Sequence, residues 1–234
     1  MIRTILLLLA LSSAAVSAKT LDDILAKARS FVGPEDKIDS VDSLYYEGVM
    51  ELANGGPDRV ISLLLEKPAK QRLVITQGDG RITMVVNGLE GFMMQENLTT
   101  GESGFAPLPL EQVRRFKANA AENLFFFEFP ASAQVRVKYL GETDFRGETV
   151  AKVRYIHPGG VQFIRYFDPA TGELVGTETD TGTINTEEGK MVVDGLNFSE
   201  KVLSYEGDEL ANTITFSIVE VNPDVDEDSF SFPN

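Results

Sequence analysis

The residues able to do chemistry are few in this 234-residue sequence, and their spacing fits no familiar catalytic or metal site. His157 is the only histidine and cysteine is absent, so a transition metal lacks a plausible set of ligands. A catalytic base also needs a nucleophile, yet neither a Gly-x-Ser-x-Gly nor a Ser-x-x-Lys motif occurs. We therefore interpret His157 as a strand-end residue beside the Pro158-Gly159-Gly160 turn, and we predict no enzyme activity, no metal and no other cofactor.

Acidic side chains are the other obvious candidates, since the chain holds 36 Asp and Glu residues. Several of them crowd the stretch from Asp224 to Asp228, where calcium could bind, but this stretch lacks the glycine-turned loop of an EF-hand. We interpret it as a solvated acidic tail. A glycosidase needs two carboxylates at a defined separation, and so many acids place some pairs close by chance. The number of acidic residues therefore predicts neither a calcium site nor glycosidase activity.

Apolar side chains in two kinds of pattern carry the functional prediction instead. In the first half of the chain they alternate with polar residues, as in strands with one apolar face, and later several return at helical spacing. Methionine and phenylalanine suit a pocket that accepts flexible alkyl chains; the alternative is that each residue simply packs in the core. We predict that a lipid-binding cavity and its lid are formed by Leu63, Leu65, Leu73, Ile75, Met84, Phe92, Met94, Leu110, Val113, Phe116, Phe125 and Phe127.

The predicted lid runs from Pro107 to Phe129 and begins as a helix. Leu110, Val113 and Phe116 follow one another at intervals of three residues, which places them on one helical face. Pro109 suits the first helical position. A cluster of four phenylalanines between residues 125 and 129 then presents more apolar surface than a connection between strands needs. We expect this segment to pack against a sheet.

Strand and turn signals make up most of the remaining sequence. Asn87-Gly88 and Gly78-Asp79-Gly80 predict tight hairpins, Thr20 to Asp23 is typical of a capping box that starts a short helix, and Thr181 to Gly189 has the polar character of a loop. We expect about five strands before the lid and six after it. Such local connections favour one antiparallel meander that curls. The predicted fold class is mainly β (α+β), a curved antiparallel sheet with helices covering its concave apolar face.

The first 18 residues have the pattern of a secretory signal, with Arg3, an apolar run from Ile5 to Leu11 and small residues at a cleavage site. We predict a signal peptide over residues 1–18 and an exported single domain over residues 19–234. The formal net charge of −15 argues against nucleic acid as a partner. Without cysteine there is no disulfide and no lipid-modified N-terminal cysteine, so we expect a soluble monomer.

The order of these features is similar to that of the periplasmic lipoprotein carriers, the LolA/LolB-like family of outer-membrane lipoprotein-sorting proteins. The similarity covers most of the mature chain and includes the signal, a short helix, a strand meander, interrupting helices and a second meander. Local matches are Lys67-Pro68 after a strand, Asn87-Gly88 before Phe92, and the acidic ending through Phe232-Pro233. The resemblance implies an unclosed β-barrel, capped by helices, that shields lipoprotein acyl chains or other lipid in the periplasm.

Lys67 departs from the family pattern, in which an arginine before the proline holds the lid shut. An arginine fork can bond several carbonyls at once, whereas lysine is a single flexible charge, so Lys67 is a candidate lid latch of a different kind. By resemblance we expect a carrier or chaperone that binds lipoprotein acyl chains or other lipid for transfer toward the outer membrane, with inner-membrane donor and outer-membrane acceptor proteins as partners. The alternative is an envelope sensor or regulator of the same fold that binds a protein partner.

Overall fold

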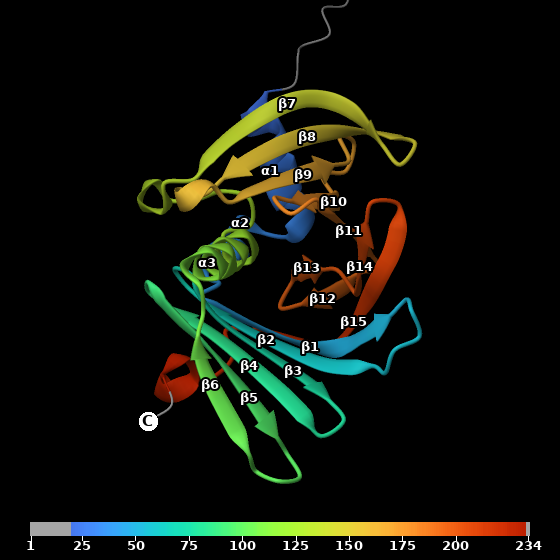
Figure 1. Ribbon diagram of the computed structural model, residues 1–234. Coiled ribbons are helices and arrows are strands. Elements are labelled where there is room, and N and C mark those ends of the chain that lie inside the picture. The colour runs from blue at the N-terminus through green and yellow to red at the C-terminus, as the bar shows by residue number, and fades with distance from the viewer. Residues whose placement is uncertain (1–19, 233–234) are drawn as a thin grey trace, which may run out of the picture.

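The computed structural model describes residues 20–232, whose main feature is one long antiparallel sheet that curls without closing on itself (Figure 1). Its strands are β1 (Ser43–Leu52), β2 (Arg59–Glu66), β3 (Lys70–Gln77), β4 (Gly80–Asn87), β5 (Glu90–Asn97), β6 (Ser103–Pro107), β7 (Arg136–Phe145), β8 (Glu148–Ile156), β9 (Gln162–Phe167), β10 (Leu174–Thr179), β11 (Thr183–Glu188), β14 (Lys201–Glu206) and β15 (Glu209–Val221). They pair in the order β6-β5-β4-β3-β2-β1-β15-β14-β11-β10-β9-β8-β7.

Helices and a small hairpin pack against this sheet. They are α1 (Leu21–Val32), α2 (Glu35–Asp39), α3 (Leu110–Leu124) and the strands β12 (Met191–Val193) and β13 (Leu196–Phe198), with short 3-10 turns at Ala131–Ala133, Pro158–Gly160 and Glu227–Phe230. The predicted mainly β fold, an unclosed curved sheet with helices, is therefore confirmed. The predicted signal peptide, residues 1–18, lies outside the described residues. No helix within residues 20–232 has the length and apolar character needed to cross a membrane.

The first and last strands of the sheet lie at its centre, because β1 pairs with β15. The two edge strands are β6 and β7, and α3 is the segment of chain that connects them. In Figure 1, α3 accordingly lies between the half of the sheet formed by β1 to β6 and the half formed by β7 to β10. The predicted lid helix thus occupies the opening at which a closed barrel would have joined its edges.

Local sequence explains where the main helices begin and end. Thr20 and Asp23 form the predicted capping box, with Asp23 N donating to Thr20 Oγ1 over 3.2 Å and Thr20 N donating to Asp23 Oδ2 over 3.0 Å. The sequence predicted Pro109 as the first helical residue of α3. Pro109 instead lies just before the helix, because its ψ of 143° is extended. After α3 ends, Phe126 and Phe127 adopt φ angles of 44° and 75°. Bulky residues rarely take such angles, and these two turn the chain sharply.

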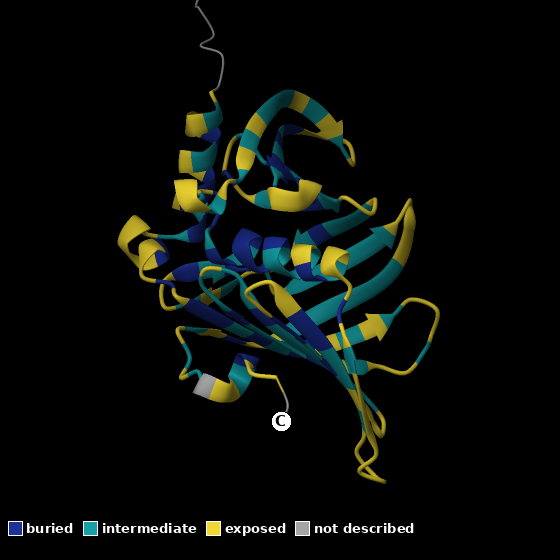
Figure 2. Ribbon diagram, turned by 60° about the vertical axis from the view of Figure 1, so that its left-hand side comes forward, coloured by how far each residue is buried: buried dark blue, intermediate teal, exposed yellow. Residues whose placement is uncertain are grey.

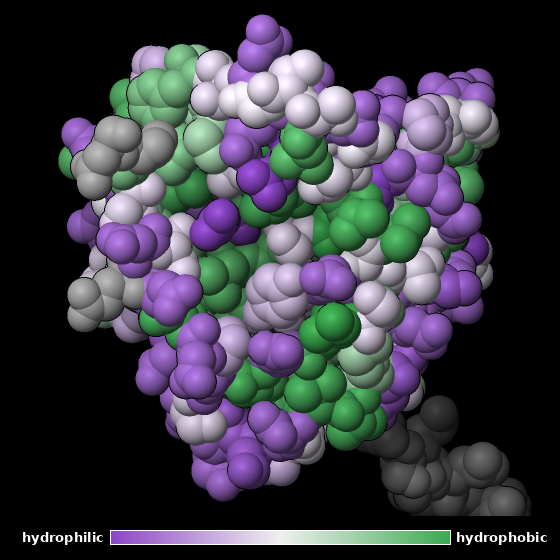
Figure 3. Space-filling view, turned by 90° about the horizontal axis from the view of Figure 1, so that it is seen from below, coloured by the Kyte–Doolittle hydropathy of each residue, from purple (hydrophilic) through white to green (hydrophobic). Residues whose placement is uncertain are grey.

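Apolar side chains gather on both faces of the sheet. The main cluster joins α1, α2 and the C-terminal half of α3 to the concave face, and Figure 2 shows α3 buried at that end and more exposed at the other. A second cluster of Val85, Phe92 and Phe230 lies on the convex face, beneath the C-terminal segment. From below, apolar patches on the surface alternate with polar and charged groups (Figure 3). The sheet therefore buries apolar surface on both sides in its β4 and β5 region.

Two predictions about strands were wrong. The stretch from Thr181 to Gly189, expected to be a loop, contains β11, which pairs with β10 and β14. In the described chain six strands precede α3 and nine follow it, instead of about five and six. Polar side chains along β11 hid its period of two, and the three-residue strands β12 and β13 are too short to give a pattern.

Candidate functional site

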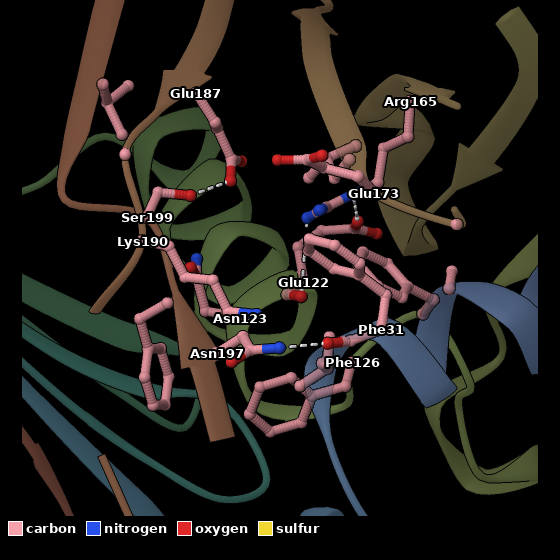
Figure 4. A pocket seen from close by; sticks show the side chains of 18 of the residues that line it. Phe31, Glu122, Asn123, Phe126, Arg165, Glu173, Glu187, Lys190, Asn197 and Ser199 are labelled. Atoms are coloured by element: carbon pink, nitrogen blue, oxygen red, sulfur yellow. Dashed lines mark hydrogen bonds and ion pairs between the residues drawn. The ribbon is translucent and has the colours of Figure 1, made fainter. Parts of the chain in front are cut away.

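A partly enclosed cavity of about 190 Å³ lies between α1, the end of α3, the β12–β13 hairpin and the concave face of the sheet (Figure 4). Its apolar walls are formed mainly by Phe31, Val32, Tyr46, Leu63, Phe126, Phe127, Phe198, Val202 and Phe216. Its polar lining consists of Glu122, Asn123, Arg165, Glu173, Glu187, Lys190, Asn197 and Ser199. Since an apolar cavity of about 150 Å³ can hold a benzene ring, this space has room for about eight carbon atoms.

Glu122 fixes α3 to the upper half of the sheet at the edge of this cavity. Its Oε1 lies 2.5 Å from Nε2 of His157, and its Oε2 accepts a hydrogen bond of 2.6 Å from Nε of Arg165 on β9. All three side chains are buried. The Arg165 guanidinium also lies over the Phe127 ring, 5.1 Å from its centre. Because both Glu122 oxygens are engaged, this carboxylate is placed to position the helix and its neighbours.

His157 lies at the end of β8 beside the Pro158–Gly160 turn, as predicted. Its contact with Glu122 was not predicted, because no sequence pattern links residues on a helix and a distant strand. The described residues include no group of three or more His, Asp or Glu side chains placed to hold a metal ion.

Glu187 extends from β11 into the cavity and faces the side from which Arg165 approaches (Figure 4). Ser199 Oγ donates a hydrogen bond to its Oε2. Burial raises the pKa of the Glu187 carboxyl, and the nearby Arg165 charge opposes that rise. Within residues 20–232 Glu187 makes no ion pair. It is therefore a partly buried acid with incomplete charge compensation, and its side chain points into the cavity.

Arg29 of α1 binds the end of the lid segment, a role that the family resemblance had implied for the residue before Pro68. Its Nη1 donates to the carbonyl oxygens of Phe125 and Phe126, each at 3.2 Å. Its charge is paired with the carboxylates of Glu35, Asp39 and Glu128. Lys67, the candidate latch, contacts the same segment differently, with its Nζ 5.5 Å from the centre of the Phe125 ring. The guanidinium group that binds the lid carbonyls thus comes from helix α1, and not from the position before Pro68.

The sheet register brings together five of the predicted cavity residues on the concave face: Leu63, Leu65, Leu73, Ile75 and Met84. Of these, Leu63 lines the cavity, as does Phe127 from the segment after α3. Leu65 is buried in the main cluster. Val113 and Phe116 pack with Met84 in a separate cluster beneath the start of α3. The predicted set therefore spreads along the whole concave face, and only part of it reaches the cavity.

Phe92 and Met94 do not lie on the concave face, contrary to the prediction. The β4–β5 hairpin pairs Met84 with Met93 and Val85 with Phe92, and residues directly opposite each other in an antiparallel pair share a face. Phe92 and Met94 therefore point to the convex face, where they pack with Val85. Every second residue after Met84 would include Phe92 and Met94, but the hairpin turn shifts that alternation by one residue.

The other two predicted lid residues lie outside the cavity. Leu110, at the start of α3, is 54% exposed. The Phe125 ring packs against Phe129 at a centroid distance of 5.7 Å. Both belong to the lid segment, but neither wall nor floor of the cavity includes them.

Neither a protein-family model nor a curated protein matches the sequence. Solved structures do match the fold. A LolA superfamily protein from Nitrosomonas europaea has a TM-score of 0.58 at 13% identity, with 92% of this chain and 99% of that chain covered. A DUF1329 family protein from Desulfovibrio piger has a TM-score of 0.57 at 11% identity, covering 90% and 96%. A domain named for outer membrane lipoprotein sorting, from Vibrio parahaemolyticus, has a TM-score of 0.52 at 13% identity, covering 88% and 95%.

These likenesses confirm the predicted resemblance at the level of the fold. The open antiparallel sheet of this chain is similar, over nearly its whole length, to that of a LolA superfamily protein. Identities this low leave the function of the cavity to be argued from its own residues.

Proposed function

We propose that this protein is a non-enzymatic periplasmic carrier or chaperone that binds a lipoprotein acyl chain, or another lipid, for transfer toward the outer membrane. The observation that carries the proposal is the cavity on the concave face, whose walls are largely aromatic and aliphatic. Its support is the likeness in fold to a LolA superfamily protein and to a domain named for outer membrane lipoprotein sorting. The signal-like residues 1–18 support a periplasmic location.

The size of the cavity suits weak and reversible binding. Burial of each methylene contributes about 0.8 kcal/mol, so a segment of about eight carbon atoms contributes on the order of 6 kcal/mol before the costs of association. That gain corresponds to a Kd of tens of micromolar at the tightest, and the costs of association weaken it further, which suits a carrier that must release its cargo. A complete acyl chain is longer than this segment, so the cavity must widen for it.

The β12–β13 hairpin is the element most suited to such widening. The C-terminal half of α3 belongs to the main core through Ala118, Ala120 and Leu124, and Glu122 ties it to the buried side chains of His157 and Arg165. The hairpin enters the same core through Leu196 and Phe198, but it has two strands of only three residues. Asn197, on β13, donates a hydrogen bond to the backbone oxygen of Phe31 and so closes the hairpin over the cavity. We therefore assign the gate to the hairpin and a positioning role to α3.

A cavity-filling substitution tests the proposal. Val202 lines the cavity from β14, and Val202→Phe should remove most of the space. The native protein, purified with its bound molecules, should release lipid or acylated peptide on extraction and mass spectrometry, and the variant should release at least about tenfold less. The neighbouring Leu203→Phe is the matched control, because adjacent strand residues point to opposite faces, and it should retain its lipid.

Two outcomes would contradict the carrier. Purified wild-type protein that carries no lipid but captures one envelope protein would favour the regulator of the same fold. Turnover of a substrate that is lost on a single Asp or Glu substitution would show an enzyme.

A further inference from the structure

The charged groups around the cavity are not balanced, and this imbalance bears on the head group of the ligand. The lining includes three acids and two bases, namely Glu122, Glu173, Glu187, Arg165 and Lys190. Glu122 and Arg165 form a buried ion pair with each other, so their charges are mutually compensated. Glu173 and Lys190 are exposed and therefore screened by water and salt.

Glu187 is the group that remains. It is more buried than Glu173, and in the described chain its carboxylate has a single hydrogen bond, from Ser199. A carboxylate offers about four acceptor sites, and leaving them empty in an apolar surrounding costs free energy. The raised pKa of Glu187 has burial as its first cause. A ligand that brings a hydrogen-bond donor or a positive charge to this side chain would relieve that cost.

Resting on the proposed lipid-binding function, we propose that the cavity selects a single-chain amphiphile whose head group donates hydrogen bonds to Glu187 and bears no negative charge. An alkyl ammonium is the strongest form of such a head and a hydroxyl a weaker one. A carboxylate or phosphate head would meet Glu187 as a like charge, in a cavity whose arginine is already paired with Glu122. The formal net charge of −15 acts in the same direction at long range.

Octyl compounds share one chain length, which fits the cavity, so differences in their affinity report the contribution of the head group alone. Isothermal titration calorimetry of the purified, delipidated protein with octylammonium, octan-1-ol and octanoate should give affinities in that order, with octylammonium at least about tenfold tighter than octanoate. Glu187→Gln should weaken octylammonium about tenfold while changing octan-1-ol by less than about twofold.

Glu188→Gln is the control with the same change in net charge. Glu188 is the next residue on β11 and is exposed, so this variant should bind all three compounds as the wild type does. Octanoate binding as tightly as octylammonium, or equal losses in the two variants, would overturn the head-group selection and leave lipid binding intact. Failure of all three compounds to bind would overturn the proposed function together with this inference.

Discussion

Glu187 has a predictable effect on stability because burial raises its pKa above the ordinary value. The folded state then holds the proton more tightly than the unfolded chain does, so stability falls as pH rises through the ordinary pKa of about 4.3 toward the raised one. Glu187→Gln removes this loss. The variant should melt at a higher temperature than the wild type at neutral pH, and the difference should vanish below about pH 4.

Thermal unfolding of both proteins across this pH range measures the effect. Glu188→Gln should change the melting temperature only slightly, because Glu188 is exposed. A Glu187→Gln variant that is less stable than the wild type at neutral pH would mean that the ionised carboxylate is favoured in the fold.

Single residues were the least predictable part of the site. The sequence directed attention to Lys67, whereas Arg29 supplies the bonds to the lid carbonyls. Arg29 lies 38 positions earlier, on a helix whose pattern indicates only an apolar face. Glu122 was missed for a related reason, since an acid on a helix is ordinarily solvated. Only the sheet brings Arg165 and His157 to it.

At the scale of elements, the hairpin and α3 should differ in local stability. Asn197→Ala removes the hydrogen bond from the β12–β13 hairpin to Phe31, a loss worth about 1 kcal/mol. Amides of Met191–Phe198 should then exchange with solvent about fivefold faster, because opening of the hairpin becomes easier. Amides in the C-terminal half of α3 should exchange at unchanged rates.

Native-state hydrogen exchange measured by mass spectrometry resolves the two segments. Val192→Ala is a fitting control, because Val192 is 64% exposed in the same hairpin and its truncation should leave exchange unchanged. If α3 opened with the hairpin, or before it, the assignment of the gate would be wrong and the helix would be the lid.

Elements with strong local signals were predicted well. The capping box of α1, the Asn87-Gly88 hairpin between β4 and β5 and the helix over α3 all depend on contacts close in sequence. β11 was missed because its concave positions, among them Glu187, carry polar side chains. A period-two search sees apolar alternation and so overlooks such a strand.

At the scale of the molecule, the open edges are protected without closure of the barrel. β6 is only five residues long, and exposed Arg136 and Lys138 lie on β7. Short edges and exposed charges both discourage pairing with another chain. α3 fills the opening between the two edges on the concave side. A meander and a covering helix were predictable from sequence, but the pairing of β1 with β15 and the two-sided burial of β4 and β5 depend on long-range packing.

The two faces of the sheet should therefore respond differently to truncation. Phe92 is 3% exposed on the convex face, in ring contact with Phe105 and Phe232. Phe92→Ala should lower the free energy of unfolding by about 3 kcal/mol and leave the affinity for octyl ligands unchanged. Leu63→Ala, which enlarges the cavity on the other face, should also destabilise the protein but shift binding toward longer alkyl chains.

Chemical denaturation measures the loss of stability, and titration with alkyl chains of increasing length measures the preference. Both variants are compared at a temperature where each is folded, so that unfolding does not mimic a loss of binding. If Phe92→Ala changed chain-length preference as much as Leu63→Ala, the convex cluster would be coupled to the cavity through the single layer of strands. Independent responses would show that the chain uses one face of its sheet to hold its own C-terminal segment and reserves the other for a ligand.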